Sequence, residues 1–237
     1  MNIALILSGG TGARMGTDIP KQYIRVEDRP IISYVLDIFE EHEMIERVQI
    51  VADESWHDLI SQYAGKKLAG FSRPGANRQY SILNGLADIL TYADPKDHVI
   101  IHDAARPLVG SATITEILKT LKNHEAVTPI LPLKDTIYLY ENGKFTGTAQ
   151  RAKLAAGQAP EGFLRGRYYE AVKGLLPDRI LHITGSLQAA LEAGMDAVPI
   201  PGDEGNFKIT TMADLEKFRQ IIQQGKAVRD HDRRECS

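Results

Sequence analysis

The chain has 237 residues, a formal net charge of −3 and one cysteine, Cys236. A weakly negative balance argues against a nucleic-acid partner, which usually shows as a basic stripe or a basic domain. One cysteine can form neither a disulfide framework nor a cysteine zinc site, so we expect a reducing, cytoplasmic setting. No apolar run approaches the ~20 residues of a membrane span, so we expect no membrane partner.

Short apolar runs alternate along the chain with segments of helical periodicity, a pattern that predicts an α/β fold with a mostly parallel sheet flanked by helices. The expected strands are residues 3–7, 48–51 and 98–101, with an edge strand at 197–201. The expected helices are residues 30–39, 55–63, 79–90, 161–174, 186–193 and 212–223. We expect residues 1–224 to form a single domain and residues 225–237 to form a charged, solvated tail.

A hairpin is predicted between the parallel-sheet segments. Residues 137–140 and 144–146 flank Asn142-Gly143, a dipeptide that suits a type I′ turn. A two-stranded ribbon is only marginally stable alone in water, so this one should pack against another surface.

The first strand ends in a run of small residues that we call the glycine loop: Ser8, Gly9, Gly10, Thr11 and Gly12. Successive backbone N–H groups of such a run can form a concave nest for phosphate oxygens. Arg14 and Lys21 follow closely enough to reach a polyphosphate held there, and Pro20 restricts the backbone before the lysine. The alternative is a tight strand-to-helix turn without a ligand.

Two common phosphate motifs do not fit the glycine loop. The dinucleotide fingerprint G-x-G-x-x-G would need glycine at Met15, and Gly16 comes one residue late. A Walker A loop would need lysine after Gly16, where Thr17 stands. A nicotinamide dehydrogenase is therefore disfavoured.

The run G-G-T-G-A-R-M-G followed by P-K-Q-Y resembles the opening of the nucleotidyltransferases that join a nucleotide to sugar or polyol phosphates. It is most similar to the cytidylyltransferases that act on 2-C-methyl-D-erythritol 4-phosphate and on ribitol 5-phosphate, and the match continues to about residue 220. The resemblance implies a Rossmann-like fold of the nucleotide-diphospho-sugar transferase type. It also implies transfer of CMP from CTP with release of pyrophosphate, with Arg14, Lys21, Arg151 and Lys208 as the catalytic cations.

The resemblance further implies that the arm at residues 134–151 clasps a second subunit to form a homodimer. Methylerythritol phosphate, an isoprenoid precursor, is the first choice of acceptor, and ribitol 5-phosphate, for surface glycans, is a close second. A module that binds CTP without catalysis is the alternative of a different class, and the retained cations argue against it.

Asp103 follows the strand at 98–101 and is the expected magnesium ligand, because Mg²⁺ takes few protein carboxylates and keeps phosphates and waters as its other ligands. An ordinary loop aspartate is the alternative. The family's H-D-A-x-R-P motif, which lines the nucleotide site, is present at residues 102–107, so Ala104 is expected there too. A phosphate nucleophile needs no general base, so His102 is expected to support the site by packing.

Residues 75–81 resemble the family's G-x-x-R-x-x-S segment, which recognises base and ribose. The residues expected to line the nucleotide there are Gly75, Ala76, Arg78 and Ser81. The alternative is an ordinary turn before a helix. For the acceptor, the phosphate is expected at Arg106, Arg151 and Lys208, and hydroxyl partners at Thr136 and Thr184.

Four positions depart from the pattern of the methylerythritol enzymes. The family's Q-T-P-Q-x-F reads here with Ala159 and Glu161, so a hydroxyl and an amide have become a methyl and a carboxylate. Gly185-Ser186 follows Thr184 where an acidic residue is typical, and Gly205 takes another acidic position. These changes lie on the acceptor side of the expected site.

Overall fold

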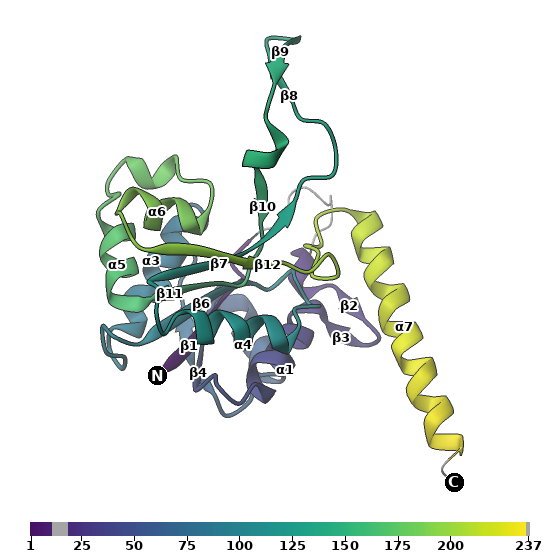
Figure 1. Cartoon of the computed structure of the whole chain (residues 1–237). Coiled ribbons are helices and arrows are strands. Elements are labelled where there is room, and N and C mark those ends of the chain that lie inside the picture. Colours follow the sequence, from purple (N-terminus) through teal and green to yellow (C-terminus); the bar gives the residue numbers. More distant parts are fainter. Residues whose placement is uncertain (11–18, 236–237) are drawn as a thin grey trace.

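The computed structural model describes residues 1–10 and 19–235, with side chains up to residue 225 (Figure 1). Thr11, Gly12 and Arg14, which the sequence assigns to the phosphate site, lie outside the described residues. None of the helices in the described part of the chain combines the length and the apolar composition that a membrane span requires.

A mixed sheet runs through the centre of the fold, and its order in the described residues is β10-β7-β11-β6-β1-β4-β5 (Figure 1). Its strands are β1 (Asn2–Leu7), β4 (Arg47–Val51), β5 (Leu68–Ser72), β6 (His98–Asp103), β7 (Ala126–Pro132), β10 (Ala155–Gly157) and β11 (Glu161–Leu164). β12 (Ala197–Pro201) is the predicted edge strand, and it pairs in parallel with β7. β1 pairs in parallel with both β4 and β6, whereas β10 and β11 are antiparallel to their neighbours.

Helices cover both faces of this sheet. α1 (Ile31–Glu41), α2 (His57–Ser61) and α4 (Ser111–Thr120) pack on one face, and α3 (Arg78–Ile89), α5 (Arg165–Lys173) and α6 (Ser186–Glu192) on the other. β1 serves both, because Ala4 and Ile6 join the first core cluster and Ile3 and Leu5 the second. A strand buried on both faces explains the continuous apolar run in the sequence. The expected α/β architecture is confirmed.

A third, smaller core lies between β2 (Arg25–Val26), β3 (Arg29–Pro30) and α7 (Met212–Glu235), where Leu215 and Phe218 are buried. α7 runs well past residue 223, so residues 225–235 of the expected tail continue the helix. Helix-forming charged residues follow Gly225 without a proline, which allows the backbone to stay helical.

The expected helix at 161–174 is wrong in its first turn, because residues Glu161–Leu164 form strand β11 and the helix begins at Arg165. The reason is tertiary. A Cβ on Gly162 would lie 2.3 Å from the Ile117 side chain of α4, so the backbone packs directly against that helix. The same residues pair with Ile100 and Ile101 of β6.

The predicted hairpin consists of β8 (Tyr138–Glu141) and β9 (Lys144–Thr148) and projects away from the sheet (Figure 1). Asn142 and Gly143 have φ values of 48° and 81°, as a type I′ turn requires.

His42, at the end of α1, is a buried histidine whose two ring nitrogens are both used. Its Nδ1 accepts from the Met44 N–H at 3.2 Å, and its Nε2 lies 3.2 Å from the Ser111 carbonyl oxygen. Burial lowers the pKa of His42 below its usual value of 6.5, and the Lys67 ammonium acts in the same direction, although the Ser111 carbonyl and Glu43 oppose it.

The free energy of unfolding is expected to fall as pH drops through 6.5, because the unfolded chain then takes up a proton that folded His42 refuses. Protonation of Nδ1 would also remove the acceptor of the Met44 N–H. Urea unfolding of wild type and His42→Asn at pH 7.5 and 5.5 measures this fall. The variant should show a flatter pH dependence, with exposed His182→Asn as the control. Equal slopes in wild type and His42→Asn would contradict the assignment.

Candidate active site

Four strands end side by side at the edge of the sheet where the candidate site lies. The parallel register pairs Leu7 with Val51 and with Asp103, and Val51 with Ser72. The glycine loop, the 73–77 turn and the loop after Asp103 therefore leave the sheet at the same edge. Ligands of open α/β sheets bind outside such strand ends, so the glycine loop and the loop after Asp103 are placed to face one crevice.

The start of the glycine loop is held by contacts from two directions. A Cβ on Gly9 would lie 2.7 Å from Pro74 Cβ, so the loop and the 73–77 turn touch where only glycine fits. Below the loop, the buried Gln22 amide donates to the Ser8 carbonyl at 2.6 Å and to the Gly10 carbonyl at 2.8 Å. Gln22 was not predicted as a site residue, because only the fold shows that its amide is buried.

Ser8 supports the loop instead of donating to a ligand. Its N–H bonds the Val51 carbonyl at 2.8 Å, which continues the sheet by one residue. Its hydroxyl donates to the Tyr23 hydroxyl at 2.8 Å. The expectation that Ser8 contributes an N–H to the nest is therefore wrong, because this N–H continues the sheet.

Lys21 opens a short 3₁₀ turn, Lys21–Tyr23, whose next two residues are buried. The Tyr23 ring stacks on Trp56 with centroids 4.1 Å apart, so Trp56 is a packing residue. The backbone of Lys21 is thus fixed by the buried side chains that follow it.

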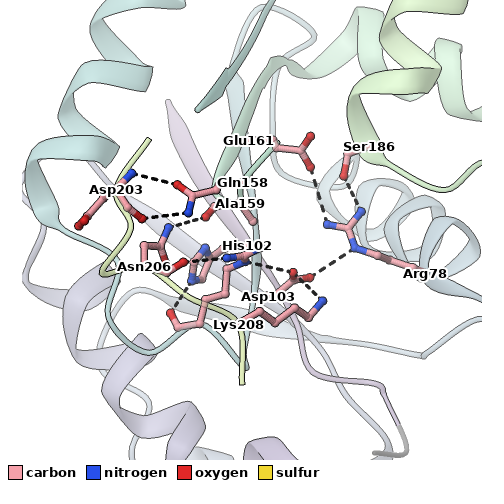
Figure 2. A network of polar contacts seen from close by, with 11 residues as sticks. Arg78, His102, Asp103, Gln158, Ala159, Glu161, Ser186, Asp203, Asn206 and Lys208 are labelled. Atoms are coloured by element: carbon pink, nitrogen blue, oxygen red, sulfur yellow. Dashed lines mark hydrogen bonds and ion pairs between the residues drawn. The ribbon is translucent and has the colours of Figure 1, made fainter. Parts of the chain in front are cut away.

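Asp103 lies at the centre of a cluster of three cations (Figure 2). Its Oδ2 accepts from Lys208 Nζ at 2.9 Å, and its Oδ1 accepts from Arg78 Nε at 3.3 Å. Arg106 Nε is 3.7 Å from Oδ2. Burial alone would raise the pKa of the Asp103 carboxyl, but Arg78 and Lys208 hold it well below its usual range. The carboxylate is therefore ionised throughout the physiological range.

His102 is buried one residue earlier, as a packing residue should be. Burial lowers its pKa to about 4, so the ring is neutral at pH 7. Its Nε2 lies 3.0 Å from the Arg106 carbonyl oxygen, which requires the Nε2–H tautomer.

Polar contacts join the loop after β6 to the two segments that complete this side of the site. Arg106 Nη1 donates to the Asn206 carbonyl at 2.7 Å, and the Asn206 amide donates to the Ala159 carbonyl at 2.7 Å. Gln158 exchanges two hydrogen bonds with the Asp203 backbone, at 2.9 and 3.0 Å (Figure 2). These bonds position Lys208 two residues beyond Asn206.

The 75–81 segment is a capped turn. The Gly75 N–H donates to Ser81 Oγ at 2.9 Å, and that hydroxyl donates to the Asn77 carbonyl at 3.0 Å. The one proton of the Ser81 hydroxyl is thus used, which leaves it only acceptor capacity toward a ribose. A Cβ on Gly75 would lie 2.3 Å from Tyr80 Cβ, so glycine is required there. Ala76 is exposed and open to a ligand.

Three further predicted residues lie outside the cluster. Arg151 and Thr136 are exposed near the base of the hairpin, where Arg151 Nη1 donates to the Lys134 carbonyl at 2.6 Å. Thr184 is exposed just before α6. Ala104 is buried beside Asp103, and its N–H bonds the Leu7 carbonyl at 3.0 Å.

Comparison with known proteins agrees with this geometry. The family model of 2-C-methyl-D-erythritol 4-phosphate cytidylyltransferase matches residues 2–224. The chain belongs to this family, which is one of nucleotidyltransferase enzymes. A relative of that name from Neisseria gonorrhoeae is 31% identical, with 93% of this chain and 97% of the relative covered. The family predicted from the glycine loop and the P-K-Q-Y motif is confirmed.

Other relatives and solved structures extend the comparison. A bifunctional enzyme IspD/IspF from Paramagnetospirillum magneticum is 34% identical over 93% of this chain, and the chain spans 56% of its length. A solved 4-diphosphocytidyl-2C-methyl-D-erythritol synthase superposes with a TM-score of 0.79 at 26% identity, covering 93% of this chain and 98% of its own. The Francisella tularensis structure, at 22% identity and a TM-score of 0.80, covers 92% of this chain and 98% of its own and shows the shared fold.

Proposed function

We propose that this family member transfers CMP from CTP to 2-C-methyl-D-erythritol 4-phosphate and releases pyrophosphate. The observation that supports this most is the group of Arg78, Arg106 and Lys208 around ionised Asp103, at the strand ends next to the glycine loop. Glu161 also lies beside Arg78, so three cations face two carboxylates, which still leaves a positive surplus that suits two phosphate substrates.

The proposed reaction is an in-line attack by an acceptor phosphate oxygen on the α-phosphorus of CTP. The new phosphate–phosphate bond forms as the bond to the pyrophosphate oxygen breaks, and both products keep their charge as anions. The nucleophile is already anionic, so neutral, buried His102 is not needed as a base. Lys21 and Arg14 would stabilise the charge on the α-phosphoryl and leaving oxygens, and Lys208 and Arg151 would align the acceptor phosphate.

A divalent cation such as Mg²⁺ fits the donor set at Asp103. The carboxylate is ionised, and the described residues contain no group of three or more metal-ligating side chains. Such a site suits an ion that takes most of its ligands from phosphates and water. When bound, the ion would neutralise triphosphate charge, while Asp103 is the residue that would hold it.

A substrate panel tests the proposal. Pyrophosphate release is measured for the purified chain with CTP, UTP, ATP or GTP, each with 2-C-methyl-D-erythritol 4-phosphate or ribitol 5-phosphate. Release with CTP and the methylerythritol acceptor is the expected result. If only ribitol 5-phosphate turned over, it would replace 2-C-methyl-D-erythritol 4-phosphate as the proposed acceptor. CTP binding without pyrophosphate release for either acceptor would indicate a binding module.

We further propose that the hairpin mediates a homodimer that places Arg151 and Thr136 at the partner's site. The aromatic side chains of the hairpin are not buried against the rest of the described chain: Tyr138, Tyr140 and Phe145 are 57%, 65% and 74% exposed. A group of exposed aromatic side chains of this kind indicates a protein contact.

Phe145→Ala is expected to raise the dissociation constant of the dimer about tenfold or more, as loss of a central aromatic anchor does. Sedimentation across a concentration series measures this. Leu191→Ala, which removes an exposed apolar side chain on α6, is the control. A dimer of unchanged affinity would exclude this part of the hairpin from the interface.

A further inference from the structure

Glu161, which departs from the family pattern, and Ser186, which follows the departing Gly185, meet on one guanidinium (Figure 2). Arg78 Nη1 donates to Ser186 Oγ at 2.5 Å, and Arg78 Nη2 lies 3.8 Å from Glu161 Oε2. Its Nε bonds Asp103 Oδ1 at 3.3 Å. One side chain of α3 thus joins the first residue of β11, the first residue of α6 and the last residue of β6.

Both partners of Arg78 are buried. Glu161 is 8% exposed and Ser186 is fully buried. A buried carboxylate is costly unless a cation or several hydrogen bonds accompany it. Burial raises the pKa of Glu161, and the Arg78 guanidinium and the Ser186 hydroxyl act to lower it. Arg78 is therefore the group that makes an ionised Glu161 tolerable at this position.

The contact between Arg78 and Asp103 is single and long, although arginine and carboxylate favour a bidentate pair. The terminal nitrogens of Arg78 are instead turned to Ser186 and Glu161. Asp103 Oδ2 is thus left to Lys208 Nζ, at 2.9 Å, and to the more distant Arg106 Nε, at 3.7 Å. Without Glu161, the guanidinium could rotate toward Asp103 and compete with Lys208 for the same carboxylate.

We propose that Glu161 and Ser186 are positioning residues for cytidylyl transfer, which fix Arg78 so that its Nε alone reaches Asp103. The inference rests on the proposed function. It also connects the acceptor side to the nucleotide side, because Ser186 follows the Thr184-Gly185 segment at the start of α6. The segment after Thr184 gives Arg78 a hydroxyl partner, Ser186, and β11 gives it a carboxylate partner, Glu161.

Glu161→Gln keeps the shape of the side chain and removes its charge. The kcat of pyrophosphate release is expected to fall about 10- to 100-fold, the usual cost of losing a supporting partner. KM for CTP should stay constant or fall, because the variant makes the site more positive. Its three cations then face one carboxylate, Asp103, whereas in wild type they face two. Adding Ser186→Asp to Glu161→Gln returns a carboxylate to Arg78 and should restore most of kcat. Glu192→Gln, on α6 and paired with Arg179, is the control.

The position of Arg78 is also measured without activity, from the NMR signal of its Nε–H, which is assigned by its loss in Arg78→Lys. In Glu161→Gln this signal should shift and exchange faster with solvent. If Glu161→Gln does not fold, Ser186→Ala takes its place with the same two readouts. An unchanged Nε–H signal, an unchanged kcat, or a kcat that the added carboxylate does not restore would overturn the inference. A wild type that releases no pyrophosphate would refute the proposed function, while the Nε–H signal still decides the positioning role.

Discussion

Replacing Lys21 by alanine is expected to lower the rate of pyrophosphate release at least about 100-fold, the usual cost of removing one preorganised charge from a transition state. Two polyanions must approach each other in the proposed reaction, so fixed cations are expected to carry much of the catalysis. Lys21 is well placed for this task because the buried Gln22 and Tyr23 anchor its backbone, and Gln22 also holds the glycine loop.

The fold should survive the Lys21 substitution. The Lys21 side chain is not among the buried residues, and the turn is held by the Tyr23 N–H bond to the Pro20 carbonyl at 2.8 Å. Thermal unfolding of Lys21→Ala should therefore match wild type, and steady-state kinetics should show the loss in kcat. Exposed Lys66→Ala is the control for loss of one positive charge. Near-normal turnover in Lys21→Ala would refute the catalytic role.

Asp103→Asn is expected to damage both activity and stability. One amide cannot accept from both Lys208 and Arg78 as the carboxylate does, and its NH₂ group would face cations. We expect kcat to fall about 100-fold or more because the cations and any metal ion lose their common anchor. Stability should fall by about 2 kcal/mol, less than for a fully buried pair because the cationic side chains keep some solvent contact.

Pyrophosphate release at increasing magnesium concentrations, together with urea unfolding, measures both effects of Asp103→Asn. Asp37→Asn removes a carboxylate from the exposed Arg29 pair and is the matched control. A variant that needs more magnesium for half-maximal rate would support the metal role of Asp103. Unaltered kcat and magnesium dependence would show that Asp103 only ties the three cations together.

Local sequence was enough to predict the elements whose pattern is local. The apolar run of β1, the periodicity of α3 and the Asn142-Gly143 turn depend on neighbouring residues, and the structure places all three where they were expected. The motifs around Asp103 and Lys208 likewise identified two residues that the fold brings together, with Lys208 Nζ 2.9 Å from Asp103 Oδ2.

What the sequence could not give depends on contacts between distant segments. Glu161–Leu164 became a strand because Gly162 packs against α4, and no local pattern encodes that approach. The Ser8 N–H is not available to the nest, because β4 lies beside β1 and its Val51 carbonyl accepts that N–H. The changes at Glu161 and Gly185 are separate in the sequence, and only the packing of β11 and α6 around α3 brings Glu161 and the neighbouring Ser186 to Arg78. The sequence by itself determined the family, the sheet and the cations, whereas the tertiary structure decided which groups each cation faces, because side-chain partners are chosen by proximity in space.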